Sequence, residues 1–160
     1  MAAYIKFDGV DGEAKAKDHK GWSKLASFGQ GLHKPVGSST GSTRRRGEVI
    51  FDDITVSKKL DKAGVKIAEA MCRGKVFAKV EIHLTASYTD AGRVTYYAYE
   101  LKNVLVTSYS ISGSGQPNDV PVEDLALNFE EIKVTYSEMS IKGNKKGIVE
   151  YSWTVEEGAA

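Results

Sequence analysis

Segments rich in β-branched and aromatic residues recur along this chain, and residues that favour turns separate them. Such segments predict β-strands, because these side chains fit a pleated, half-buried surface. Many short strands at regular spacing indicate a β-sandwich or a β-barrel. The expected strands cover Tyr4–Phe7, Ser23–His33, Glu48–Lys58, Phe77–Ser87, Arg93–Thr107, Val122–Ser137 and Ile148–Val155. In the third of these, the alternation changes phase near Asp52 and Asp53, which suggests a bulge.

One segment has helical spacing instead. Asp61 can cap the first amides, Gly64, Ile67, Ala68 and Met71 fall on one face, and Gly74 is placed to end the helix. A helix is therefore expected over Lys62 to about Arg73. Together the patterns predict a mainly β fold, a two-sheet β-barrel or sandwich with one flanking helix over residues 62–73. Residues 1–160 form one domain in this interpretation, a length that buries roughly 70% of the unfolded surface.

Composition narrows the classes of function. A formal net charge of +1 argues against a globally basic nucleic-acid binder, so no nucleic-acid partner is expected. No apolar run approaches the roughly 20 residues of a spanning helix, and the start lacks a signal-peptide pattern. We therefore expect folding in the cytoplasm, no membrane insertion, and no use of the general secretory route. Cys72 is the only cysteine, which excludes an internal disulfide.

The sequence offers no catalytic constellation. It lacks the G-x-S-x-G motif of a nucleophile elbow, and His19, His33 and His83 have no metal-binding spacing. His83 is better explained as a histidine on a strand face, and Cys72 as a small packing residue. Neighbouring carboxylates on a strand point to opposite faces, so they do not form a glycosidase pair. We expect no enzyme activity, no cofactor and no metal; the carboxylate pairs are Asp52/Asp53, Glu130/Glu131 and Glu156/Glu157.

The strand around residues 97–115, YAYELKNVLVTSYSISGSG, does not alternate cleanly. Val104, Leu105 and Val106 are consecutive, so both faces appear to be covered there before small hydroxyl side chains take over. The interpretation is that something besides the chain's own core covers this strand.

A long segment without apolar spacing follows Pro35, and its composition predicts an exposed loop. Arg44, Arg45 and Arg46 could bind an acidic protein surface, or the loop could simply be solvated. Phosphate or nucleic-acid binding is disfavoured, because the P-loop spacing and stacking aromatics are absent. The loop consists of Val36, Gly37, Ser38, Ser39, Thr40, Gly41, Ser42, Thr43, Arg44, Arg45, Arg46 and Gly47.

Several separated stretches resemble one family, in the family's order and over nearly the whole chain. They are IKFDGVDGEAKAKDH, ITVSKKLDKA, YELKNVLVTSYSISGSG, LNFEEIKVTY and GIVEYSW. They are similar to the haemolysin-coregulated protein (Hcp) family, the tube proteins of the type VI secretion system. The resemblance implies a β-barrel of which six copies close into a ring. Rings would stack into a tube that a contractile sheath expels from a Gram-negative bacterium, with a spike protein at its tip and effectors carried in the lumen. It implies no enzymatic activity.

The resemblance also assigns residues. Ser27, Gly29 and Gly31 would line the lumen and contact effectors, while Phe28 and Leu32 would pack in the core. The loop from Val36 to Gly47 would reach the adjacent ring during stacking. Glu123 and Asp124 are candidate acidic partners for its arginines.

A rival hypothesis is a monomeric β-barrel that binds a small ligand inside. Trp22, Trp153 and the tyrosines would line its cavity, unless they pack in the core or in a ring interface.

Overall fold

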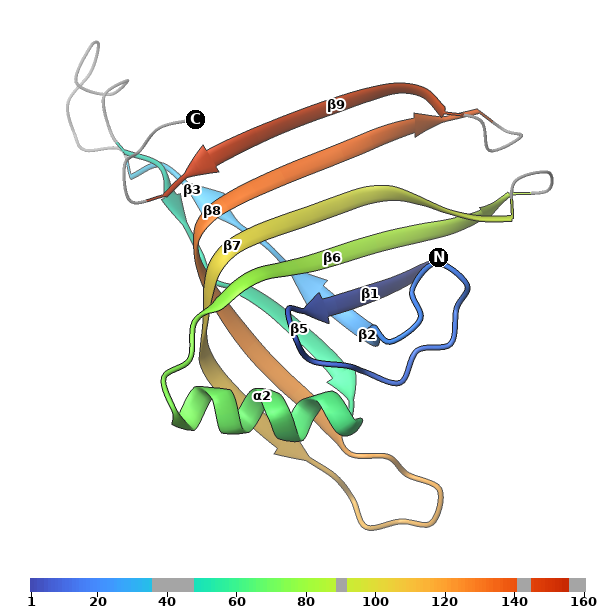
Figure 1. Cartoon of the computed structure of the whole chain (residues 1–160), viewed down its shortest axis with the longest axis vertical. Coiled ribbons are helices and arrows are strands. Elements are labelled where there is room, and N and C mark those ends of the chain that lie inside the picture. The colour runs from blue at the N-terminus through green and yellow to red at the C-terminus, as the bar shows by residue number, and fades with distance from the viewer. Residues whose placement is uncertain (36–47, 89–91, 141–144, 156–160) are drawn as a thin grey trace.

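The computed structural model describes residues 1–35, 48–88, 92–140 and 145–155 (Figure 1). The predicted loop Val36–Gly47, and most of the expected turn at Asp90–Gly92, lie outside these ranges. The elements are β1 (Ala2–Phe7), β2 (Ser23–Gly29), β3 (Leu32–His33), β4 (Ile50–Phe51), β5 (Ile54–Lys59), α2 (Lys62–Cys72), β6 (Phe77–Tyr88), β7 (Gly92–Ser112), β8 (Val122–Met139) and β9 (Lys145–Thr154).

Six strands form a closed antiparallel barrel. Their order is β5-β2-β1-β6-β7-β8, and β5 also pairs with β8 to close it. The long strand β8 serves two partners: residues 122–127 pair with β5, and residues 131–139 pair with β9. Strand β9 therefore extends the sheet beyond the barrel, and β3 and β4 form a separate two-stranded sheet. This confirms the predicted mainly β fold.

Two of the expected strands are each divided. The predicted strand Ser23–His33 ends as β2 at Gly29, and its last two residues pair with β4 instead. The predicted strand Glu48–Lys58 breaks at Asp52 and Asp53 into β4 and β5. The phase change in the sequence thus marks a transfer of the chain between sheets, not a bulge within one strand.

Three neighbouring strands bend at the same level of the barrel (Figure 1). Buried side chains on each strand are normally two residues apart, but here they are three apart. The paired residues on either side of the bend are Phe77, Val104 and Phe129 below and Val80, Leu101 and Ile132 above. Asn103 lies at this level with a φ of 53°, a conformation that asparagine tolerates better than most residues.

The bend accounts for the irregular pattern before residues 104–106, while the prediction that something besides the core covers the strand stays a prediction. Val104 and Val106 both face the core, whereas Leu105 points outward and is 37% exposed. Ordinary alternation therefore resumes after the bend. The three consecutive apolar residues do not cover both faces of the strand within this chain.

Helix α2 lies across one end of the barrel (Figure 1). The Asp61 carboxylate accepts hydrogen bonds from the amides of Ala63 and Gly64, which confirms the predicted cap. The helix ends at Cys72, one residue before the predicted end. Its buried face, which covers the core, consists of Ala63, Gly64, Ile67 and Ala70.

Candidate functional site

The outward faces of β2, β5 and β8 form a shallow, hydroxyl-rich hollow of about 280 Å³. The register places Ser27 opposite Ser57, and Ser57 opposite Asp124. Partners across antiparallel strands share a face, so these side chains project together. The hollow therefore presents small polar groups, and its lining residues are Ser27, Phe28, Gly29, Thr55, Val56, Ser57, Ser108, Asp124, Leu125 and Ala126.

The structure brings together two of the three residues assigned to the lumen. Ser27 and Gly29 both line the hollow, and a Cβ on Gly29 would lie 3.2 Å from the hydroxyl of Thr55. Gly31 lies beyond the end of β2, where its carbonyl accepts the amide of Asp52 at 2.9 Å.

Of the two residues expected to pack in the core, Phe28 does so and Leu32 does not. Phe28 packs against the core, with its ring 6.0 Å from that of Tyr99. Leu32 is 49% exposed, so the prediction that it packs in the core was wrong. The alternation on which that prediction rested stops where β2 ends.

Glu123 is a second correction. Its side chain is fully buried inside the barrel and accepts a hydrogen bond from Lys58 at 2.6 Å. It therefore cannot serve as a surface partner for the arginines of the 36–47 loop. Asp124, the next residue, points outward and is exposed. The alternation of Glu123 with Leu125 and Leu127 was the sequence signal for this burial.

A network of buried polar groups surrounds Glu123. The Lys58 ammonium also lies 2.6 Å from Asp61, and Asp61 accepts from the Ser23 hydroxyl at 2.7 Å. Tyr109 donates to the other oxygen of Glu123. Buried charges are tolerated only when they are paired and hydrogen-bonded, and this network ties the start of α2 to four strands, β2, β5, β7 and β8.

The network sets the protonation of its members. Burial alone would raise the pKa of Asp61, but the hydrogen bonds from Lys58 and Ser23 hold it below its ordinary value. Burial, together with the hydrogen bond to Glu123, raises the pKa of Tyr109 to about 12. Both groups therefore keep their usual charge at neutral pH.

His19 and His83, the latter predicted to lie on a strand face, meet over β1 and β6. Nε2 of His19 lies 3.0 Å from Nδ1 of His83, and Nε2 of His83 lies 3.4 Å from Glu81. Because a carboxylate only accepts, the neutral pair places a proton on Nε2 of each ring. Burial lowers the pKa of both histidines. His19 stacks on Tyr4 at 4.6 Å and meets Trp22 edge-on.

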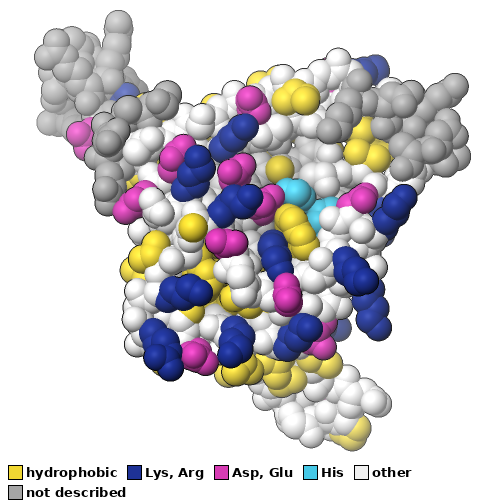
Figure 2. Space-filling view, in the orientation of Figure 1, with side chains coloured by type: hydrophobic (Ala, Val, Ile, Leu, Met, Phe, Trp, Pro, Cys, Tyr) yellow, Lys and Arg dark blue, Asp and Glu magenta, His cyan; other side chains and the backbone are white. Residues whose placement is uncertain are grey.

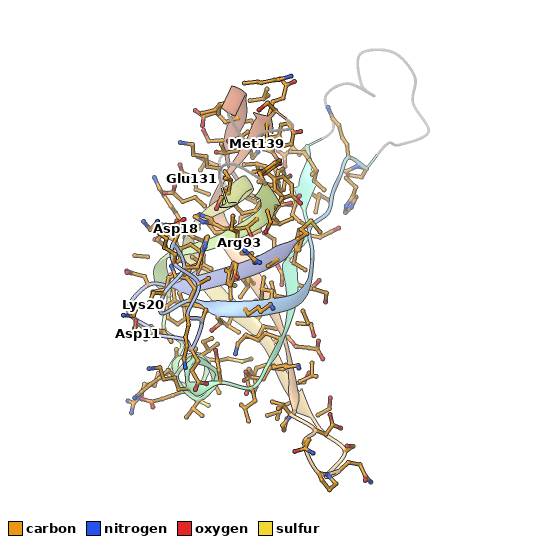
Figure 3. The ribbon with its side chains drawn as sticks, turned by 90° about the vertical axis from the view of Figure 1, so that its right-hand side faces the viewer. Asp11, Asp18, Lys20, Arg93, Glu131 and Met139 are labelled. Carbon is orange, nitrogen blue, oxygen red and sulfur yellow. The ribbon has the colours of Figure 1, made fainter. Side chains whose placement is uncertain are left out.

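This cluster anchors the segment of residues 8–22, which runs alongside β1. Figure 3 shows Asp11, Asp18 and Lys20 on this segment, with Arg93 nearer the strands. Arg93 donates to the hydroxyl of Tyr4 at 3.1 Å. Trp22 therefore packs outside the barrel rather than lining a cavity within it, and Trp153 packs against the core. The proposed internal ligand cavity is thus not where the two tryptophans lie.

Strand β9 ends the sheet with a free edge in the described ranges. Its backbone groups on that side have no strand partner there, and such an edge is a template for pairing with another chain. Val149 is 71% exposed. Tyr136, which pairs with Val149, and Tyr151 share its face, whereas Ile148 lies on the opposite face; all three are exposed.

Comparison with known proteins identifies the family. The model of the family described as "Type VI secretion system effector, Hcp" matches residues 4–136. The chain belongs to the Hcp family. It is 28% identical to Protein hcp1 of Pseudomonas aeruginosa over 155 residues. This match covers 96% of this chain and 94% of that protein. Hcp proteins are tube proteins of type VI secretion rather than enzymes, so this chain is a secreted tube protein.

Solved structures agree. A structure titled as a type six secretion system protein matches with a TM-score of 0.88 and 26% identity, over 98% of this chain and 97% of that one. Hcp1 from Salmonella typhimurium matches with a TM-score of 0.77 and 20% identity, over 99% and 97% of the two chains, and supports the fold. In the described ranges no helix is long and apolar enough to cross a bilayer. The same ranges contain no group of three or more His, Cys, Asp or Glu side chains suited to a metal.

Proposed function

We propose that six copies of this Hcp chain close into a ring, and that rings stack into the tube that the type VI sheath expels. The observation that carries this proposal is the edge strand β9. Its outer edge has no strand partner within the described part of the chain, and it carries exposed apolar side chains on both faces, a surface that a lone subunit does not need. A ring buries such a surface against a different surface of the next copy.

The hydroxyl-rich hollow is the proposed contact surface for effectors in the lumen. Ser27, Gly29, Thr55 and Ser57 are small, so they leave room for cargo, and the three hydroxyl groups bind it through hydrogen bonds. In the assembled machine the proposed partners are other copies of the ring, a spike protein at the tip, the sheath and the carried effectors.

The ring proposal is tested with Val149→Asp. Val149 is so exposed that its substitution should change the stability of the subunit by no more than about 0.5 kcal/mol. A charge buried in an interface without a partner is costly, so the variant should lose closed rings in native mass measurements. Val65→Asp is the matched control, because Val65 is 65% exposed on α2. Normal rings from Val149→Asp would remove β9 from the interface.

The cargo surface is tested separately with Gly29→Gln. The larger side chain should fill the hollow and reduce co-purification of effectors, while rings still form. Normal loading in intact rings would take Gly29 out of the contact surface.

Replacing Arg44, Arg45 and Arg46 with glutamate should weaken stacking of rings more than closure of each ring; unchanged tube assembly would eliminate the stacking role of that loop.

A further inference from the structure

Two lysines face each other on the outer surface of the barrel. Leu25 of β2 pairs with Lys58 of β5, and the next step along this register sets Lys24 across from Lys59. Both lysines are exposed and both line the same two hollows. Like charges directly opposite each other destabilise a pair of strands. The two lysines therefore concentrate positive charge beside these hollows.

No carboxylate in the described ranges forms an ion pair with either lysine. Two acids line the larger hollow, but each already has a partner. Glu13 accepts the amide of Lys62 at 3.1 Å, and Asp61 belongs to the buried network with Lys58. A third lysine, Lys15, stands on the opposite wall, also without an ion pair in those ranges.

The larger hollow has apolar surface between these charges. Its volume is about 440 Å³, and Leu60 and Val120 line it together with Ala14 and Ala16. A second hollow of about 180 Å³ lies on the other side of the lysine pair, against Leu25 and Ala26. Figure 2 shows, on the face that carries α2, Lys and Arg intermixed with Asp and Glu. Lys24 and Lys59 differ from these cations in that neither has an ion-pair partner among the described residues.

The walls of the larger hollow are fixed by backbone hydrogen bonds. Gly12 and Ala14 donate to the carbonyls of Gly21 and Trp22 at 2.7 and 2.8 Å. On the other side, the amide of Leu60 donates to the carbonyl of Pro121 at 2.9 Å. A site formed in advance loses less entropy when a ligand binds.

We propose that this hollow binds an acidic, extended segment of a partner protein. An apolar side chain of that segment occupies the space between Leu60 and Val120, and its carboxylates pair with Lys24 and Lys59. Charge complementarity selects this occupant, because neither cation has an ion-pair partner among the described residues and both flank an apolar floor. Its binding requires only the subunit, so it stands apart from ring closure and from the hydroxyl-rich hollow.

The test is fluorescence anisotropy with a labelled Glu-Glu-Leu-Glu-Glu peptide and the full-length protein at low ionic strength. We expect saturable binding that weakens with salt and falls roughly fivefold for each of Lys24→Gln and Lys59→Gln, as solvent-exposed ion pairs would. Lys66→Gln on α2 is the matched control and should bind normally. Peptides with Gln for Glu, or Ser for Leu, should each bind more weakly.

Two further readouts keep the proposal open to refutation. The double variant Lys24→Gln/Lys59→Gln should be at least as resistant to urea as the parent, because it removes a repulsion. Native mass is recorded for every variant, so a failed ring is distinguished from a failed peptide site. Undiminished peptide binding by the double variant would overturn the proposal. The proposal would also be overturned if single-stranded DNA bound more tightly than the peptide and its binding depended on the same lysines.

Discussion

Gly64→Ala tests whether the buried network holds α2 in place. In an exposed helix this change would stabilise by about 1 kcal/mol, because alanine is the better helix former. Here the new Cβ would lie 2.0 Å from an oxygen of Glu123 and 2.5 Å from its carboxyl carbon. The carboxylate is fully buried and held by Lys58 and Tyr109, so it cannot move aside without breaking those contacts.

The expected net effect is a loss of about 2–4 kcal/mol in the free energy of unfolding. Overpacking costs roughly 1–3 kcal/mol and disrupting a buried ion pair roughly 3–5 kcal/mol, and the two costs overlap at this site. The gain in helix propensity offsets about 1 kcal/mol. Urea denaturation followed by tryptophan fluorescence, at one fixed protein concentration, measures the difference.

Two comparisons isolate the cause. Val65→Ala, on the exposed face of the same helix, should change stability by no more than about 0.5 kcal/mol. In a Glu123→Ala background the clash is gone, so Gly64→Ala should become neutral or stabilising. If Gly64→Ala instead stabilises the parent protein, or costs as much without Glu123, the reasoning is refuted.

Two further predictions concern titratable groups. Since burial holds the pKa of His19 and His83 below the unfolded value of 6.5, the unfolded state binds more protons between their folded pKa and 6.5. The free energy of unfolding should therefore fall as pH drops below about 6.5, and His83→Gln should flatten this dependence; an equal slope in the variant would argue against the histidines. Asp61→Ala removes the helix cap and one of the two carboxylates that pair with Lys58. It should lower the free energy of unfolding by about 2–4 kcal/mol, measured by urea denaturation at pH 7. Glu13, whose carboxylate accepts only the amide of Lys62 at the start of α2, is the comparison. An equal cost from Glu13→Ala would show that the buried pair adds nothing.

Local patterns predicted the elements well. Strands β1, β6, β7 and β8 and helix α2 lie where alternation, helical spacing and turn residues placed them. Each of these signals depends only on residues that are close in sequence, so it can be recognised without knowing the fold. Ends were less certain: β7 continues to Ser112, five residues past its predicted end, because β8 supplies pairing partners there.

Features that depend on distant partners could not be read in the same way. Lys58 and Glu123 are 65 residues apart, and only closure of the barrel by β5 and β8 brings them together. The shared bend of β6, β7 and β8 needs the register of three strands. Gly64 in a helix was a visible signal of a close approach, but its partner was not identifiable from the sequence.

The candidate lumen residues also show which features follow from local patterns and which depend on distant partners. Ser27 and Gly29 share a face because they alternate within one strand, and this much follows from the sequence. Leu32 was misassigned to the core by extending that alternation past the end of β2, and Gly31 also lies beyond that end, so its place in the lumen stays a prediction. Thr55, Ser57 and Asp124 join the hollow only through pairing between strands.

The most direct test of the tube assignment is the native mass of the purified protein, with negative-stain images of the same sample. Six-copy particles with a central hole are the predicted result, and Val149→Asp should abolish them while Val65→Asp does not. A plain monomer at high concentration would contradict the proposal that this chain closes into rings on its own.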